Sequence, residues 1–273
     1  MRHNRNKKDN IFGGKRVKIF FTMRKKEWLF IFLFAVAVIT LTCLLLPYKD
    51  FVAYTYAKQR KLPVYSVRTE EKKIAISFDC AWGVDYTDKL LDVMEKENVK
   101  CTFFMVEFWV KKYPEYVKKI DERGHEIGTH SATHPHMNGL SVGEIEKELL
   151  TSKNAIREIT GKDVILFRPP FGEYSNKVIE SAERQNLIAI QWSVDSLDWK
   201  NISAKEIAER VLKRVKKGSI VLFHNQGLHT AEALPTIIKE LKEQGYEFVT
   251  IGDLIYKDDY YIDGTGEQIK STK

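Results

Sequence analysis

The chain has few cysteines: Cys43, Cys80 and Cys101 are the only three among its 273 residues. Three thiols are too few for the disulfide framework that holds many small secreted domains together. Cys80 closes one predicted strand and Cys101 opens another, and in parallel strands these are opposite ends, beyond the span of a disulfide. The fold must therefore rest on a hydrophobic core, which the 44% apolar composition can supply.

An excess of positive charge is missing from most of the chain. The net charge is +7, but residues 1–26 hold ten Lys or Arg and one Asp, a local charge of +9. Subtracting this from the total leaves −2 for residues 27–273. A nucleic-acid-binding domain carries a basic face on its folded part. We therefore expect no nucleic-acid partner.

One long apolar run is present, from Trp28 to Pro47, with no charge and no polar face. A helix of this length spans about 30 Å, the hydrocarbon thickness of a bilayer. The basic residues before it, within a basic arm of residues 1–27, favour the cytoplasmic side. We expect a single-pass anchor in the cell membrane over residues 28–47, with the main domain extracellular. A cleaved signal peptide is the alternative, with a weak cleavage candidate at Thr55-Tyr56-Ala57.

After the apolar run, residues 48–72 are mixed and polar and are expected to form an extracellular stalk. Residues 73–257 alternate strand-like with helix-like stretches, and residues 258–273 are expected to be a polar, frayed tail. The predicted strands are 74–79, 101–106, 164–168, 187–192, 219–223 and 247–251; the predicted helices are 86–97, 110–123, 141–159, 175–184, 203–216 and 231–244. This alternation predicts an α/β domain with a parallel sheet, open or closed as a barrel, whose site lies at the carboxyl ends of the strands.

Two histidines stand four residues apart in Gly128-Thr129-His130-Ser131-Ala132-Thr133-His134-Pro135. The spacing puts both rings on one side if the segment makes a helical turn, although Pro135 favours a turn or loop. Neutral imidazole binds zinc and similar divalent metals. Two ordinary surface histidines are the alternative, and His136 is interpreted as a neighbour of the pair rather than a ligand.

Other polar residues follow or end apolar runs. Asp79 could bind a metal, act as a general base for a metal-bound water, or cap the next helix. His224 can donate a proton to a leaving amine, or be an ordinary core histidine. Arg168 opens the rigid corner Arg168-Pro169-Pro170-Phe171-Gly172, where it can hold a carboxylate or face solvent.

The segment Asp195-Ser196-Leu197-Asp198-Trp199 follows another predicted strand. A carboxylate near a histidine can set its tautomer and raise its pKa. Trp199 can form an apolar wall against a sugar ring or an acyl methyl group, or it can belong to the core.

In this order the segments resemble the motifs of the polysaccharide deacetylases of carbohydrate esterase family four. The family motifs are Thr-Phe-Asp-Asp-Gly, His-Ser-x-x-His, Arg-x-Pro-Phe/Tyr-Gly, Asp-x-x-Asp-Trp and Leu-x-His. The matching segments here are Ser77-Phe78-Asp79-Cys80-Ala81, His130-Ser131-Ala132-Thr133-His134, Arg168-Pro169-Pro170-Phe171-Gly172, Asp195-Ser196-Leu197-Asp198-Trp199 and Leu222-Phe223-His224. The resemblance covers about residues 73–255 and implies a distorted (β/α)7-type barrel with mostly parallel strands.

The resemblance also implies a divalent metal, zinc for preference, and a role for each matching residue. By this resemblance His130 and His134 hold the metal, and Asp79 is the base that activates the attacking water. His224 is implied to protonate the departing sugar nitrogen, with Asp198 orienting it and Arg168 holding Asp79. The implied substrate contacts are the backbone N–H of Phe171 at the oxyanion, and Trp199 and Leu222 around the acetyl group.

One position departs from the family pattern. The second Asp of the first motif, a metal ligand in the family, is Cys80 here, and Ala81 replaces the usual Gly. A thiolate can bind zinc, Asp85 could reach the metal instead, or water could complete the coordination shell. A further alternative is a weakly held metal and an inactive domain.

The expected function is therefore metal-dependent hydrolysis of N-acetyl groups on an extracellular amino-sugar polymer, with peptidoglycan the favoured N-acetylated glycan. The alternative is a catalytically weak or inactive, glycan-binding, wall-associated protein on the same scaffold, because Cys80 replaces a metal ligand. An esterase acting on O-acetyl groups or xylan is a third, more remote alternative.

Overall fold

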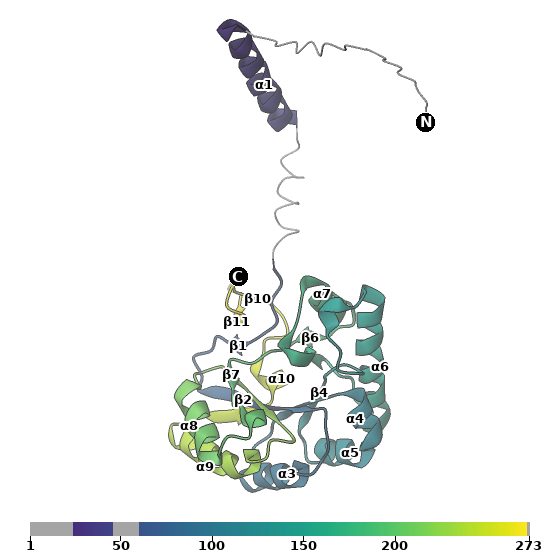
Figure 1. The fold of residues 1–273 in the computed structure, drawn as a ribbon. Helices are drawn as coiled ribbons and strands as arrows, with labels where there is room; N and C mark the ends of the chain where they lie inside the picture. Colours follow the sequence, from purple (N-terminus) through teal and green to yellow (C-terminus); the bar gives the residue numbers. More distant parts are fainter. Residues whose placement is uncertain (1–23, 46–59, 272–273) are drawn as a thin grey trace, which may run out of the picture. The chain divides into compact units, whose positions relative to one another are not determined.

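The computed structural model describes residues 24–45 and 60–271, which fall into two units, one ending at Gln59 and one beginning at Arg60 (Figure 1). In the first unit, helix α1 (Lys25–Leu45) has largely exposed side chains. By length and composition it can cross a membrane, a test that a signal sequence also passes. The basic arm before Arg24 and the cleavage candidate at 55–57 lie outside the described residues.

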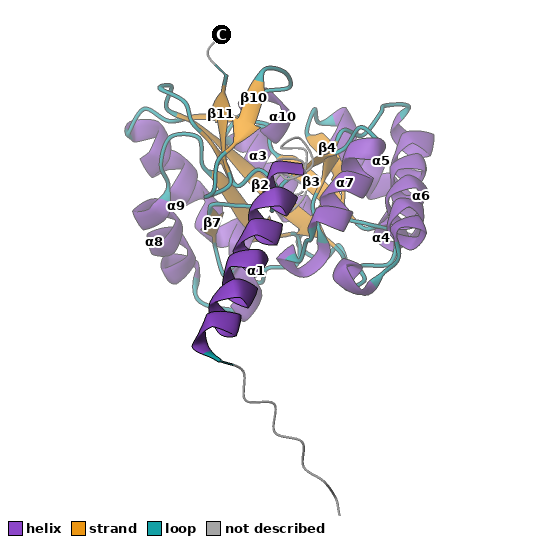
Figure 2. Ribbon diagram, turned by 90° about the horizontal axis from the view of Figure 1, so that it is seen from above, coloured by secondary structure: helices purple, strands orange, loops and turns teal. Residues whose placement is uncertain are grey.

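The second unit is built on a parallel sheet that curls into a half-barrel, with helices outside it (Figure 2). The strand order is β6-β5-β4-β3-β2-β8-β7, and β9 pairs with the start of β2. The strands are β2 (Lys73–Cys80), β3 (Thr102–Met105), β4 (Glu126–Thr129), β5 (Leu166–Phe167), β6 (Ile188–Ala189), β7 (Val194–Asp195), β8 (Ile220–His224) and β9 (Glu247–Val249). This confirms the expected α/β fold with parallel strands.

The helices follow the predicted stretches closely. They are α3 (Thr87–Lys96), α4 (Glu107–Lys112), α5 (Pro114–Glu122), α6 (Val142–Thr160), α7 (Asn176–Arg184), α8 (Ala204–Arg214), α9 (Thr230–Glu243) and the short α10 (Ile251–Leu254). The helix predicted over 110–123 is divided, because Pro114 lacks the N–H that would continue α4 and instead starts α5. Ser141 and Ser203 each form a capping box at the start of their helices.

The main core lies between the sheet and the helices. Ile76, Phe78 and Cys80 of β2 and Phe103 of β3 pack there with apolar residues of α9 such as Leu234. All residues of β2 after Lys73 are buried. A strand buried on both faces needs an apolar sequence throughout, which is why β2 and β8 are readable as continuous apolar runs.

Both ends of the predicted catalytic domain differ from expectation. Strands β10 (Tyr260–Ile262) and β11 (Glu267–Lys270) pair with each other and with β1 (Ser66–Val67) in a small second sheet. The prediction of a frayed tail is therefore wrong for these residues, and the folded unit begins at Arg60 rather than at 73. The buried Gln268 side chain holds β11 in place by hydrogen bonds to the backbone N and O of Tyr256. These are tertiary contacts that no local pattern announces.

Candidate active site

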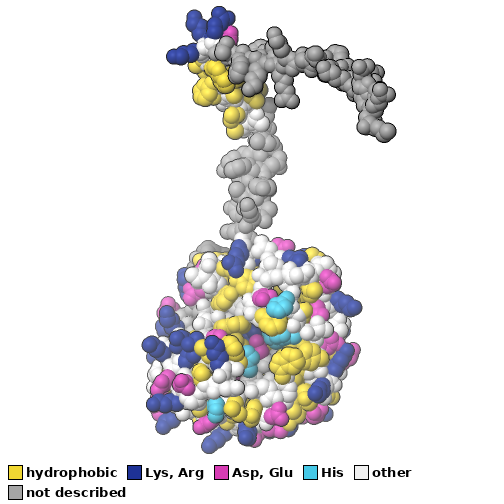
Figure 3. Space-filling model, in the orientation of Figure 1, with side chains coloured by type: hydrophobic (Ala, Val, Ile, Leu, Met, Phe, Trp, Pro, Cys, Tyr) yellow, Lys and Arg dark blue, Asp and Glu magenta, His cyan; other side chains and the backbone are white. Residues whose placement is uncertain are grey.

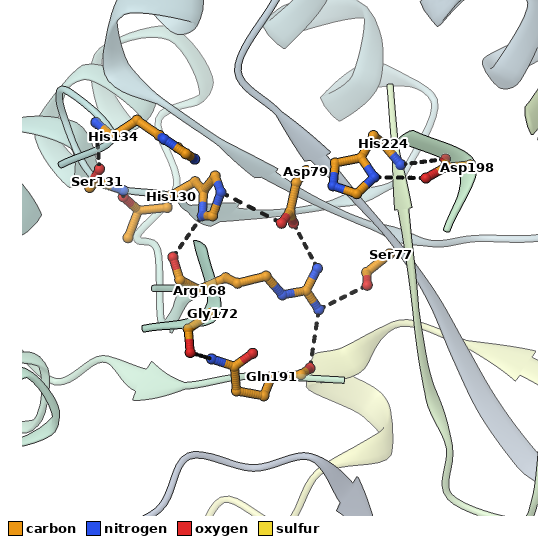
Figure 4. A network of polar contacts seen from close by, with 11 residues as sticks. Ser77, Asp79, His130, Ser131, His134, Arg168, Gly172, Gln191, Asp198 and His224 are labelled. Carbon is orange, nitrogen blue, oxygen red and sulfur yellow. Dashed lines mark hydrogen bonds and ion pairs between the residues drawn. The ribbon is translucent and has the colours of Figure 1, made fainter. Parts of the chain in front are cut away.

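The carboxyl ends of four parallel strands bring the predicted site residues to one edge of the sheet. Asp79 lies at the end of β2 and His224 at the end of β8, and their Cα atoms are register partners. His130 directly follows β4, and Arg168 directly follows β5. Figure 4 shows Asp79 between His130 and His224, with Arg168 reaching toward its carboxylate. Residues far apart in the sequence thus meet because their strands end together.

Asp79 is held in its charged form by its neighbours. The Nη1 of Arg168 donates to its Oδ1 at 2.7 Å, while the Nη2 donates to the Ser77 hydroxyl at 2.9 Å and to the Gln191 carbonyl at 3.3 Å. Burial raises the pKa of Asp79, but the charges of Arg168 and of the nearby histidines outweigh it, so the pKa lies below its ordinary value. The result is a buried carboxylate that is unprotonated at neutral pH and can accept a proton.

The histidine pair lies on the other side of this carboxylate. The Nδ1 of His130 donates to the Arg168 carbonyl at 2.7 Å, which leaves the lone pair on Nε2, 3.5 Å from Oδ2 of Asp79. The His134 ring stands edge-on to that of His130, with centroids 4.9 Å apart. Burial lowers the pKa of both imidazoles, that of His134 to about 4. Both are therefore neutral at pH 7, the form that binds metal ions.

His224 has the opposite electrostatic setting. Its Nδ1 donates to Oδ1 of Asp198 at 2.7 Å, and its backbone N donates to Oδ2 at 2.8 Å. The Thr230 hydroxyl also donates to Oδ2, at 2.7 Å, so the buried Asp198 is well satisfied. Burial lowers the pKa of His224, but the hydrogen bond to Asp198 and the charge of Asp198 outweigh it and raise the pKa above its ordinary value. His224 therefore retains a proton at higher pH than a free histidine does.

A cleft of about 690 Å³ opens over these groups. Phe171, Trp199 and Leu222 line it, and Phe171 adopts a positive φ of 58° in the short 3-10 helix η2 (Pro170–Gly172). In Figure 3, histidine and hydrophobic side chains gather on the face of the second unit turned toward the viewer. The cleft therefore has apolar walls around a polar, charged floor.

Sequence reasoning missed several residues that support the site. Gln191 accepts from Arg168 and also donates from Nε2 to the Gly172 carbonyl at 3.0 Å, which ties the η2 corner to the site. Thr230 supports Asp198, and Trp82 and Gln226 line the cleft. Ser77 stood inside a recognised motif, but the others carry no local signal, because their roles depend on which strands become neighbours.

The structure does not bring Cys80 or Asp85 to the histidines. Successive side chains of a strand face opposite sides, so Cys80 points into the main core while Asp79 faces the cleft. Burial, with the nearby charge of Asp79, raises the pKa of the Cys80 thiol well above its usual range. Asp85 is exposed, does not line the cleft, and accepts a hydrogen bond from Gln226 at 2.7 Å. The expectation that either completes a metal site is not supported by this geometry.

The donors for a divalent metal are thus incomplete. His130 and His134 supply two neutral imidazoles beside the Asp79 carboxylate, a suitable chemistry for zinc. Within the described ranges, however, no group of three His, Cys, Asp or Glu side chains is arranged to hold an ion. The chain therefore offers a divalent metal two suitable protein ligands, His130 and His134, but no described side chain in the position of the third.

A parallel α/β half-barrel with a base and an acid at the carboxyl ends of adjacent strands defines a hydrolase-like site. The family model described as polysaccharide deacetylase matches residues 66–190. The peptidoglycan-N-acetylmuramic acid deacetylase PdaA of Bacillus subtilis is 37% identical over 197 residues, covering 71% of this chain and 75% of that protein. The chain belongs to the polysaccharide deacetylase family, carbohydrate esterase family four.

Other relatives differ in length and in activity. The peptidoglycan-N-acetylglucosamine deacetylase PgdA of Listeria monocytogenes is 38% identical over 71% of this chain, but the match covers only 41% of PgdA. The match to the uncharacterised protein YlxY of B. subtilis covers 60% of YlxY. BA3943 of Bacillus anthracis, described as a family-four pseudoenzyme, has a solved structure with a TM-score of 0.69 at 36% identity, covering 70% of this chain and 68% of that one. A mutant of it is described as having restored enzymatic activity. PgdA is named for the deacetylation of peptidoglycan, whereas BA3943 is described as a pseudoenzyme on a similar fold.

Proposed function

We propose that this protein is a membrane-anchored, metal-dependent hydrolase that removes N-acetyl groups from an extracellular amino-sugar polymer, with peptidoglycan the favoured substrate. The observation that carries the proposal is the pairing of a base with an acid on adjacent strands. The pKa of Asp79 is lowered and that of His224 is raised, so one is unprotonated and the other holds a proton over the same pH range. A protein that only bound glycans would not need this pairing.

The chemistry follows from where each group lies. Asp79 accepts a proton from the water that attacks the acetyl carbonyl, and Arg168 keeps its carboxylate charged and aimed. The backbone N–H of Phe171 donates to the developing oxyanion. His224 gives its proton to the sugar nitrogen as the carbon–nitrogen bond breaks, which releases acetate and a free amine. A divalent ion on His130 and His134 would polarise the carbonyl and lower the pKa of the water.

The location and substrate are supported by separate observations. Helix α1 is long and apolar enough to anchor the chain, and the basic arm before it favours a cytoplasmic N-terminus and an extracellular domain. PdaA and PgdA are named for the removal of acetyl groups from two different sugars of peptidoglycan. An anchored enzyme facing outward meets the wall before any other amino-sugar polymer.

A second candidate function has a specific observation in its favour. Cys80 is buried in the core and does not replace the missing carboxylate, and a relative of similar fold is described as a pseudoenzyme. The domain would then bind N-acetylated glycan at the wall with little or no turnover.

Acetate release separates the two functions. The full chain, reconstituted in detergent with zinc, is incubated with N-acetylated peptidoglycan strands, and acetate is measured. An enzyme releases acetate, and Asp79→Asn lowers the rate by about 10²-fold or more. The matched control is Asp92→Asn, because Asp92 is an exposed carboxylate on α3 that pairs with Arg123 away from the cleft. Glycan binding without acetate release would favour the second candidate.

A further inference from the structure

Three large aromatic side chains of the cleft are exposed to an unusual degree. Trp82 is 66% exposed, Phe171 56% and Trp199 55%, and all three line the cleft. In the described part of the folded unit, the remaining strongly exposed aromatic is Tyr261, at 52%, on the distant small sheet. Exposed aromatic surface concentrated in one place marks a surface that binds something.

Trp82 is the member of this group to which the deacetylation chemistry gives no role. Phe171 covers the ring of His134, with centroids 4.5 Å apart, and Trp199 adjoins the acid pair through Asp198. Trp82 follows Ala81 on the loop after β2. Its ring packs against that of Phe108, with centroids 5.4 Å apart. Its ring centroid lies 6.5 Å from that of His134, and it forms part of the cleft wall beside the histidine pair. Trp82 therefore lies next to the catalytic residues but is not one of them.

The loop that carries Trp82 is fixed. The Gly83 carbonyl accepts from Nε1 of Trp109 at 2.7 Å and from Nδ2 of Asn225 at 3.0 Å, so α4 and the segment after β8 both hold it. Gly83 has a positive φ of 49°, and a Cβ there would lie 1.7 Å from Nε2 of Gln226. The indole is therefore presented to the cleft by a rigid backbone, which reduces the entropy lost when a ligand binds.

The chemistry of this wall matches a sugar ring. A pyranose has an apolar face of C–H groups, which packs on an aromatic ring, and a rim of hydroxyls, which need hydrogen-bond partners. The cleft also presents the amide side chains of Gln226 and Asn201, which can donate to and accept from hydroxyls. Its size lies in the range of clefts that bury most of a drug-sized ligand, larger than one acetyl group requires.

We propose that Trp82 is a stacking platform for a sugar unit next to the one that is deacetylated, and that it makes the protein select polymer chains over single amino sugars. This proposal rests on the proposed function for the identity of its ligand. It concerns binding of the neighbouring unit rather than the chemical step, so Trp82 is a specificity residue and not a catalytic one.

Binding to the full chain in detergent tests the proposal without turnover. In the Asp79→Asn background, the Kd for an N-acetylated chito-oligosaccharide of four units is measured by titration calorimetry. Trp82→Ala should weaken binding of the tetramer about tenfold and leave binding of N-acetylglucosamine nearly unchanged. Trp82→Phe, which keeps an aromatic face, should recover most of the loss. Tyr261→Ala is the matched control and should bind both ligands as the parent does.

Kinetics with an intact Asp79 give the second readout. Trp82→Ala should raise KM for the tetramer about tenfold with kcat nearly unchanged, because uniform binding is lost. Acetate release with the same tetramer KM and Kd in Trp82→Ala as in the parent would overturn the proposal and leave the proposed function standing. Trp82-dependent tetramer binding without acetate release would support the platform while the proposed function failed. Absence of tetramer binding by the parent would overturn the platform.

Discussion

Asp79 and His224 are Cα register partners on adjacent parallel strands, and their ionisation is driven in opposite directions by different neighbours. Arg168 stabilises the charged carboxylate on one strand, and Asp198 stabilises the charged imidazolium on the other. Because both strands are central in the sheet and fully packed, the two groups are held at a fixed separation. The acid and the base are thus set by the fold rather than by flexible loops.

The pH dependence of the reaction should reveal this arrangement. His224 acts as an acid only while protonated, and its raised pKa keeps it protonated above its ordinary value of 6.5. The alkaline limb of kcat/KM should therefore lie above pH 6.5 in the parent. Asp198→Asn removes the charge that raises this pKa, and burial then lowers it, so the limb should move to lower pH. The rate should fall about 10²-fold or more.

The pH–rate profile of both proteins, measured by acetate release, checks this expectation. An alkaline limb that stays in place in Asp198→Asn would remove His224 from the role of acid. Asp253→Asn is a suitable control, because that carboxylate lies on α10, does not line the cleft, and accepts a hydrogen bond from the Thr250 hydroxyl at 2.8 Å.

Arg168 should carry stability as well as activity. Its side chain is fully buried and bonded to Asp79, Ser77 and the Gln191 carbonyl. Arg168→Ala leaves the Asp79 charge buried without its partner, which costs about 3–5 kcal/mol of unfolding free energy. Arg168→Lys keeps a charge but loses the forked contact, so it should be more stable than the alanine variant and still slow. Urea unfolding of both variants measures the difference; equal stability of Arg168→Ala and the parent would contradict the buried pair.

Most strands of the sheet can be predicted from the sequence, because the central strands are buried on both faces and are therefore apolar along their length. The apolar runs 74–79 and 219–223 coincide with β2 and β8 almost residue for residue. Strand β4 was missed because it is short and contains Gly128, where a Cβ would lie 2.6 Å from the Phe104 ring. That requirement comes from a neighbouring strand, so a window along the chain cannot see it.

Part of the site could be predicted from the sequence, namely the residues whose type has one well-defined chemical role. Arg168 and His224 meet because parallel strands end together, which the alternation of strands and helices already implies. His130 and His134 follow β4, a strand that was not predicted, and only the family motif that they match pointed to their place in the site. Cys80 illustrates the limit: its neighbour Asp79 faces the cleft, so strand alternation turns the thiol to the core. The contacts of Gln191 and Thr230 needed the tertiary structure, because only folding decides which polar side chain meets Arg168 or Asp198.

Cys80 should matter for stability and not for metal binding. Cys80→Ser places a hydroxyl in an apolar environment, which costs about 1–3 kcal/mol if it finds no partner. The zinc Kd, measured by competition with a chromophoric chelator, should remain that of the parent. Thermal unfolding without added metal measures the stability cost separately. A zinc affinity that falls in Cys80→Ser would make the thiol a ligand and contradict its place in the core.

The metal site itself is tested by comparing alanine variants of two histidines that are close in sequence, His134 and His136. The His134 ring stands edge-on to that of His130, whereas the exposed His136 stacks flat on Phe171 and bonds Glu173 at 3.0 Å. His134→Ala should weaken zinc binding by about 100-fold or more, because one of two protein ligands is lost. His136→Ala is the matched control and should bind zinc as the parent does. Removal of zinc with a chelator should abolish acetate release from the parent, and added zinc should restore it; equal zinc affinities of the two alanine variants would exclude the His130–His134 pair as the site.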